Sequence, residues 1–214
     1  MEEEIRWLKE LPKEITILFL ASNPMDTTAL CLGEEARNIY EKIRLSEYRD
    51  TIRFETRWAV RAGDVLQAIN ETNPTIIHFS GHGCESGELV LQNPDGTMKL
   101  VTPEAISQTI ATVSDTVRLV LFNACYSETQ ARQIVEHIDA AIGMSDSIGD
   151  EAACAFAAQF YSSIGFGLSL QQAFKQAIAA LLLENINEEK TPVLVAQEDI
   201  DLNELYLVAK SDPQ

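Results

Sequence analysis

Two side chains that could act together as nucleophile and base each follow a strand-like run of residues. Cys125 comes shortly after residues 117–122, which are rich in Val and Leu, and His82 comes shortly after residues 75–80. Both runs have the length and composition of buried strands. If the two strands are parallel neighbours, both side chains emerge at the same edge of the sheet. A thiol beside an imidazole is the pairing that nucleophilic catalysis requires.

The backbone around these residues also suits this chemistry. Glycines flank His82, so its loop can approach a substrate backbone closely. The amides of Gly83 and Cys125 could together face the oxyanion that develops during attack on a carbonyl. The alternative is a purely structural role, because cysteine is among the residue types most often buried. The residues alone leave both interpretations open.

Strand-like and helix-like segments alternate along the chain, which predicts one α/β domain at residues 15–210 after an N-terminal arm at residues 1–14. A mainly parallel sheet with helices on both faces is expected. The predicted strands are residues 15–21, 52–60, 75–80, 117–122, 140–144, 192–195 and 205–208, with a hairpin at 88–101. The predicted helices are residues 32–44, 63–70, 129–137, 153–164 and 170–182, with one more beginning at 102–103.

Composition restricts the classes of partner. The 214 residues carry a net charge of −17, which argues against nucleic acid and anionic membranes and favours a basic partner. The start of the chain lacks the pattern of a signal peptide, and the longest apolar run, residues 177–183, is too short to span a membrane. Four cysteines without a CxxC pair indicate reduced thiols, so we expect a cytoplasmic protein.

The two motifs resemble those of a known family. Residues 78–83 (His-Phe-Ser-Gly-His-Gly) and 123–127 (Asn-Ala-Cys-Tyr-Ser) are similar to the histidine and cysteine motifs of CHAT-domain proteins, a branch of the caspase-like peptidases that includes relatives of separase. The resemblance extends to residues 17–24 and 141–156. It implies a caspase-like three-layer α/β/α sandwich. It also implies roles for three residues: His82 as general base, Cys125 as nucleophile and Gly83 as an oxyanion donor.

The resemblance implies a cysteine endopeptidase that cleaves protein substrates without a cofactor or metal. Regulation by a protein partner or a fused sensor domain is expected, and a bacterial defence or cell-death pathway is one setting that the family suggests. The alternative is a caspase-fold interaction module with weak or conditional protease activity. The loops around the site, which are the hairpin at residues 88–101 and the segment after Cys125, are expected to act as a latch that shifts on activation. The hairpin has turn residues and little apparent core, so it could shift at small cost.

Two acidic residues follow the predicted strand at 140–144. In basic-specific relatives such as separase, acidic residues in this region line the pocket for the side chain before the cut. The resemblance therefore makes Asp150, with Asp146 as second candidate, substrate-binding residues that would pair with Arg or Lys. The alternative for Asp150 is the N-cap of the helix that begins there. Cleavage after aspartate is not expected, because caspases proper carry a Gln-Ala-Cys pattern that this chain lacks.

Other chemistries fit less well. A zinc site built on His78, His82 and Cys84 lacks a fourth ligand, and His78 is better interpreted as a hydrogen-bonded core residue. A cysteine phosphatase needs an arginine where this chain has Ala131, and a dinucleotide site needs a third glycine. The other cysteines in helical patterns, Cys31 and Cys154, are expected to be core residues.

Overall fold

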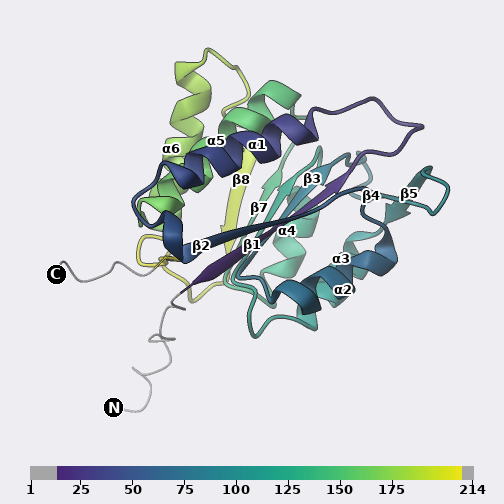
Figure 1. The fold of residues 1–214 in the computed structure, drawn as a ribbon, viewed down its shortest axis with the longest axis horizontal. Coiled ribbons are helices and arrows are strands. Elements are labelled where there is room, and N and C mark those ends of the chain that lie inside the picture. The colour runs from purple at the N-terminus through teal and green to yellow at the C-terminus, as the bar shows by residue number, and fades with distance from the viewer. Residues whose placement is uncertain (1–13, 209–214) are drawn as a thin grey trace.

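The central sheet sets the architecture of the chain. A computed structural model describes residues 14–208, so nearly all of the arm predicted at residues 1–14 lies outside the described part. Six strands follow the order β2–β1–β3–β6–β7–β8 (Figure 1). They are β1 Ile15–Ser22, β2 Ile52–Arg57, β3 Ile76–Gly81, β6 Leu119–Asn123, β7 Ala140–Met144 and β8 Pro192–Ala196. All neighbours are parallel except β7 and β8, which confirms the prediction of a mainly parallel sheet.

Helices cover both faces of this sheet and complete the predicted three layers. On one face lie α1 Leu32–Arg44, α5 Asp150–Gly165 and α6 Leu170–Leu183 (Figure 1). The other face is covered by α2 Ala62–Thr72, α3 Pro103–Ala111 and α4 Glu128–Ile134. A short 3-10 helix, η2 Arg49–Thr51, precedes β2. Because both faces are covered, every residue of β1, β3, β6 and β7 is buried.

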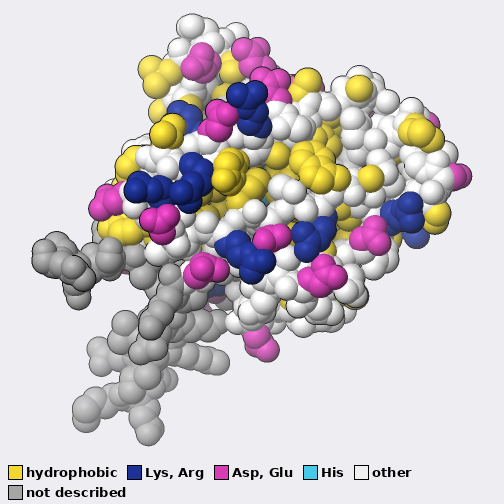
Figure 2. Space-filling model, viewed as in Figure 1, with side chains coloured by type: hydrophobic (Ala, Val, Ile, Leu, Met, Phe, Trp, Pro, Cys, Tyr) yellow, Lys and Arg dark blue, Asp and Glu magenta, His cyan; other side chains and the backbone are white. Residues whose placement is uncertain are grey.

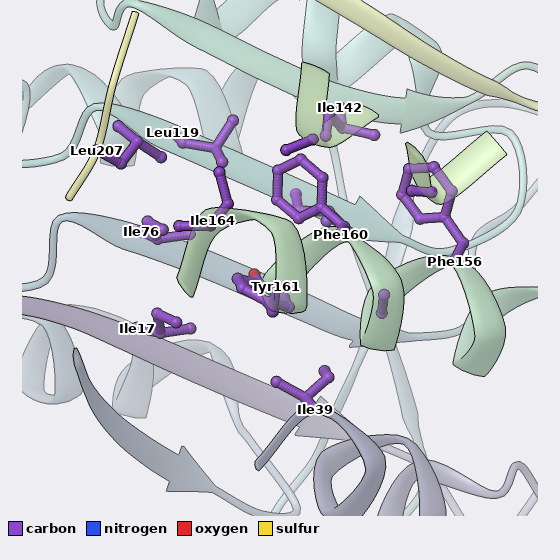
Figure 3. Close-up of a cluster of buried hydrophobic side chains, with 14 of the residues drawn as sticks. Ile17, Ile39, Ile76, Leu119, Ile142, Phe156, Phe160, Tyr161, Ile164 and Leu207 are labelled. Atoms are coloured by element: carbon purple, nitrogen blue, oxygen red, sulfur yellow. The ribbon is translucent and has the colours of Figure 1, made fainter. Parts of the chain in front are cut away.

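The alternation of side chains along the strands divides the core into two clusters. Ile17 and Phe19 of β1 pack on the side of α1 and α5, whereas Leu18 and Leu20 pack on the opposite side. The first cluster is filled by aromatic side chains of α5 (Figure 3): Phe156, Phe160 and Tyr161. These fully buried rings fix α5 over the middle of the sheet.

The predicted hairpin is present, as β4 Leu89–Gln92 and β5 Met98–Val101. The expectation that it has little core is wrong for β4, since Leu89 and Leu91 are buried in the second cluster. The backbone of β4 is also tied down. Val90 N–H donates to the carbonyl of His82 at 3.0 Å, and Gln92 N–H donates to that of Val60 at 3.0 Å. Only β5 is largely exposed, so β4 could not shift at small cost.

The strand predicted at residues 205–208 is wrong. The segment is apolar and buried, but its backbone pairs with other elements instead of joining the sheet. The carbonyl of Leu205 accepts the N–H of Leu170 at the start of α6, at 2.8 Å. The carbonyl of Tyr206 accepts from the Arg118 guanidinium at 3.3 Å. Hydrophobic pattern alone could not distinguish this buried irregular segment from a strand.

The face drawn in Figure 2 contains the edge strand β2. Hydrophobic side chains gather over α1 and β2, where Tyr40 and Trp58 are half exposed. Basic and acidic side chains alternate around them, and Arg57 pairs with Glu71 at 3.1 Å. The net charge of −17 is therefore not concentrated on this face. Within residues 14–208, none of the helices has both the length and the apolar character needed to cross a membrane.

Candidate active site

The predicted cysteine and histidine emerge at the same edge of the sheet. Strands β3 and β6 are parallel neighbours, and the last pair in their register is Ser80 with Asn123. His82 and Cys125 each lie two residues beyond that pair. This arrangement confirms the predicted placement at the carboxyl ends of neighbouring strands, where open α/β sheets place their ligands.

The backbones of the two loops are in direct contact. A Cβ atom on Gly83 would overlap the carbonyl oxygen of Cys125 and would lie 3.3 Å from its amide nitrogen. Only glycine, which has no Cβ, allows this approach. Gly81 serves a similar purpose one strand away, since a Cβ there would lie 2.6 Å from the carbonyl oxygen of Ser22 in β1. Gly83 therefore allows the His82 loop to lie against the cysteine loop, and Gly81 allows the end of β3 to lie close to β1.

A backbone carbonyl orients the His82 ring. Its Nε2 lies 2.8 Å from the carbonyl oxygen of Thr28, in the segment between β1 and α1. A carbonyl only accepts hydrogen bonds, so Nε2 must carry the proton. In the neutral ring, Nδ1 is then the atom with a free lone pair. The bond thus selects the tautomer in which Nδ1 can take up a proton.

The Cys125 thiol faces the loop between β7 and α5. Ile148 N–H donates to Sγ at 3.4 Å, and Sγ lies 3.8 Å from the carbonyl oxygen of the same residue. Among residues 14–208, the structure contains no hydrogen bond between Cys125 and His82, so the two are adjacent but not joined.

The pKa values of the other three cysteines argue against them as nucleophiles. Burial raises the pKa of Cys154 to about 12. Burial, followed by the charge of Glu88, raises the pKa of Cys84. The pKa of Cys31 is raised mainly by the charge of Asp150. All four cysteines are free thiols, as predicted. Cys31 is exposed and Cys154 is only partly buried, so the expectation that both are core residues is wrong.

Two amides near the thiol have no acceptor in the described part of the chain. Gly83 forms an isolated antiparallel bridge with Leu89, and the carbonyl of His82 and the amide of Cys84 make the hydrogen bonds that flank it. In such a pair, the middle residue directs its own N–H away from the partner strand. The N–H of Gly83 therefore points away from β4. The amide of Cys125 lies in the backbone that Gly83 contacts.

Ser127, to which the sequence analysis assigned no role, anchors the cysteine loop to β6 and β7 through hydrogen bonds. Its buried Oγ can donate to the carbonyls of Phe122 and Ala124, at 3.1 and 2.7 Å, and it accepts Met144 N–H at 3.0 Å. Gly143 of β7 makes room for this loop, since a Cβ there would lie 2.5 Å from the Ser127 carbonyl oxygen. Neighbouring strands β6 and β7 thus fix the loop that carries Cys125.

The two predicted substrate-binding carboxylates occupy different surroundings. Asp146 is tied to the cysteine loop, because its carbonyl accepts the N–H of Tyr126 at 3.2 Å and its carboxylate raises the pKa of the Tyr126 hydroxyl by hydrogen bonding. Asp150 accepts the N–H of Cys31 at 3.2 Å and lines an open cavity of about 420 Å³ beside α1. The N-cap interpretation of Asp150 is wrong: Gly149 is the N-cap of α5, and Asp150 is its first helical residue.

Sequence reasoning missed a buried carboxylate beneath the site. Glu35 of α1 is 3% exposed and accepts hydrogen bonds from Ser80 Oγ and Asn123 Nδ2. His78 is fully buried beside it and bonds to Tyr161, so its predicted role as a hydrogen-bonded core residue is confirmed. The available signal was the position of Glu35 on the apolar face of α1, three residues after Leu32.

Comparison with known proteins identifies the family. The model of the CHAT domain matches residues 22–197, which include both loops and all six strands of the sheet in whole or in part. The chain belongs to the CHAT family. The match agrees with the resemblance of its histidine and cysteine motifs, which lie at the adjoining loops of β3 and β6.

Two relatives of this CHAT domain are named as proteases. A Roc-COR-CHAT protease from an unknown prokaryotic organism is 26% identical over 172 residues, covering 77% of this chain and 16% of that protein. A probable protease from Gillisia limnaea is 24% identical over 173 residues, covering 79% of this chain and 31% of that protein. This chain therefore spans only a minor part of the length of either relative.

The same architecture occurs in a solved caspase structure. Caspase-1 from Spodoptera frugiperda superposes with a TM-score of 0.63, covering 95% of this chain and 93% of that one, at 9% sequence identity. At this identity the likeness shows the fold. The CHAT domain therefore has the caspase-like α/β/α fold that its motifs imply.

Proposed function

We propose that this CHAT domain is a cysteine endopeptidase in which His82 is the general base and Cys125 the nucleophile. The observation that carries the proposal is the contact between the two loops at the ends of β3 and β6, where Gly83 abuts the backbone of Cys125. Two relatives named as proteases support the same activity, as does the raised pKa of every other cysteine.

Each step of the proposed reaction has a group to perform it. Nδ1 of His82 takes the proton of Cys125, and the thiolate attacks the carbonyl carbon of the scissile peptide. The N–H groups of Gly83 and Cys125 stabilise the resulting oxyanion. The imidazolium then donates its proton to the leaving amine, and an acyl-enzyme remains. Water, deprotonated by the same imidazole, hydrolyses the thioester and regenerates the thiol.

The substrate preference that we propose is Arg or Lys before the cut. Asp146 and Asp150 follow β7, and a carboxylate there pairs well with a guanidinium or ammonium group. Asp146 has the closer link to the reaction, because the segment that contains it contacts both Tyr126 and the Cys125 thiol. The net charge of −17 favours basic substrates in general.

The dyad is tested by two substitutions. Cys125→Ala and His82→Ala should each abolish cleavage of a peptide library while leaving the thermal unfolding midpoint close to that of the wild type, since both residues lie in loops outside the core clusters. Cys31→Ala is a matched control, because that thiol is exposed and remote in sequence. Cleavage by Cys125→Ala at the wild-type rate would refute the mechanism.

A second candidate is a caspase-fold interaction module with weak or conditional activity. It is favoured by one observation: within residues 14–208, His82 bonds to Thr28 and Cys125 to Ile148, with no bond between them. Regulation by a partner or a fused sensor domain would close this gap, and one relative carries the name Roc-COR-CHAT. The buried β4 makes the hairpin a poor latch, which leaves the other predicted part, the segment after Cys125, together with the residues around Ile148 that contact the thiol. Cytoplasmic location and a role in defence stay predictions.

A further inference from the structure

Glu35 is an unusual residue for its position. It lies on the face of α1 that also carries Leu32, Ala36 and Ile39, all of which pack into the core. The Glu35 side chain is buried, and removing an ionised carboxylate from water is costly unless donors surround it. The groups that donate hydrogen bonds to this carboxylate offset that cost, and their positions indicate the role of Glu35 in the fold.

The compensating groups come from the two strands that precede the cysteine site. Ser80 Oγ of β3 donates to Glu35 Oε2, and Asn123 Nδ2 of β6 donates to Oε1 at 2.6 Å. His78 Nε2 of β3 lies 2.8 Å from Oε1, although its N–H is not aligned for a hydrogen bond. At that distance from a carboxylate, Nε2 must carry a proton. One carboxylate thus bridges β3 and β6.

The position of this bridge along the strands is its informative feature. Ser80 and Asn123 form the last pair of the β3–β6 ladder, beyond which the chains continue as loops. Two residues later come His82 on one loop and Cys125 on the other. The Glu35 carboxylate is therefore the last side-chain tie between the strands before the two functional residues.

The rest of the network makes this tie stiff. His78 Nδ1 lies 3.1 Å from the hydroxyl of Tyr161 in α5, and the His78 ring packs in a tilted arrangement against Phe19, with centroids 4.8 Å apart. Burial, followed by the charge of Glu35, raises the pKa of Tyr161 well above its usual value, so the hydroxyl keeps its proton and can donate to Nδ1. Asn123 Nδ2 also donates to the carbonyl of Ala153 in α5, at 3.2 Å.

We propose that Glu35 is a positioning residue, whose carboxylate sets the separation of His82 and Cys125 by tying Ser80 to Asn123. The inference rests on the proposed function. Glutamine at this position has the same shape but only one acceptor oxygen, so either Ser80 Oγ or Asn123 Nδ2 loses the oxygen to which it donates. Glu35→Gln should therefore loosen the tie without removing side-chain volume.

The test compares Glu35→Gln with a matched carboxylate-to-amide change, Asp139→Asn. Asp139 pairs with Arg118 at 2.6 Å. These residues directly precede β7 and β6, at the ends of the two strands that lie away from the site. Two rates are measured: hydrolysis of labelled casein, and carbamidomethylation of Cys125 by iodoacetamide with loss of iodide, followed by peptide mass spectrometry. Because misplacement of reacting groups by about 1 Å can cost about 100-fold, Glu35→Gln should lower kcat about 10- to 100-fold at unchanged KM. It should also slow carbamidomethylation of Cys125, whereas Asp139→Asn should alter only thermal stability.

A second variant keeps the test informative if Glu35→Gln does not fold. Ser80→Ala removes one arm of the tie and should give a smaller loss of both rates, and the double variant should lose no more than Glu35→Gln. Wild-type rates in Glu35→Gln, or additive losses when Glu35→Gln and Ser80→Ala are combined, would overturn this inference and leave the proposed function intact. If wild-type Cys125 reacts no faster than Cys125 in the His82→Ala variant, the proposed function itself fails, and this inference fails with it.

Discussion

The fit of Gly143 beneath the cysteine loop leads to a quantitative prediction. A Cβ atom at this position of β7 would lie 2.5 Å from the carbonyl oxygen of Ser127, 2.8 Å from its carbonyl carbon and 2.9 Å from Cα of Glu128. All three are backbone atoms, which cannot move aside as a flexible side chain can. Gly143→Ala must therefore displace either β7 or the loop that carries Cys125. Overpacking of this kind costs about 1–3 kcal/mol of stability.

The assay pairs thermal unfolding with peptidase turnover. For a chain of this size, each kcal/mol lowers the midpoint by about 2–4 °C, so Gly143→Ala should unfold about 2–12 °C below the wild type. Turnover should fall more steeply than stability, since the displaced segment is two residues from Cys125. Gly63→Ala is the matched control, because nothing lies within 4 Å of a Cβ there and the residue is in α2. That change should stabilise by about 0.4–1 kcal/mol. Gly143→Ala with the stability and turnover of Gly63→Ala would refute the reasoning.

Two further predictions concern titration and specificity. Because the pKa of Cys154 is raised from 9.0 to about 12, the unfolded chain loses this proton first, so the free energy of unfolding should decline as pH rises from 9.0 toward 12. Cys154→Ser should flatten that decline in denaturant titrations, and an identical slope would contradict the prediction. Asp146→Asn and Asp150→Asn should each weaken a preference for Arg or Lys before the cut in a peptide-library profile. A wild-type profile dominated by Leu or Met would rule that preference out.

The sequence predicted the positions of the candidate site residues where a local apolar pattern marked a strand and the parallel pairing of strands then fixed where the following loop lies. Apolar runs marked β3 and β6, and their parallel pairing brings the residues that follow them to one edge. His82 and Cys125 could therefore be predicted as neighbours before any coordinates. Glycines beside His82 predicted a close approach to a substrate backbone, which stays a prediction. The approach in the structure is that of Gly83 to the backbone of Cys125, which the sequence did not indicate.

The features that escaped prediction depend on partners distant in sequence. The position of Glu35 on the apolar face of α1 indicates burial, but its donors come from β3 and β6, 45 and 88 positions away, and could not be predicted. The burial of β4 depends on its backbone bonds to His82 and Val60, which no local pattern encodes. Asp150 has the side chain of an N-cap, but the N-cap of α5 is one residue earlier, at Gly149, and Asp150 is the first helical residue. Tertiary context decided each of these cases.

The central claim, that Cys125 is a nucleophile activated by His82, is tested most directly by covalent trapping. A peptidyl chloromethyl ketone alkylates an activated thiolate with loss of chloride, and intact-mass analysis with peptide mapping locates the adduct. One adduct, on Cys125, is expected in the wild-type protein, and it should be lost from the His82→Ala variant. Labelling of the exposed Cys31 instead, or labelling of Cys125 that persists unchanged without His82, would contradict the account.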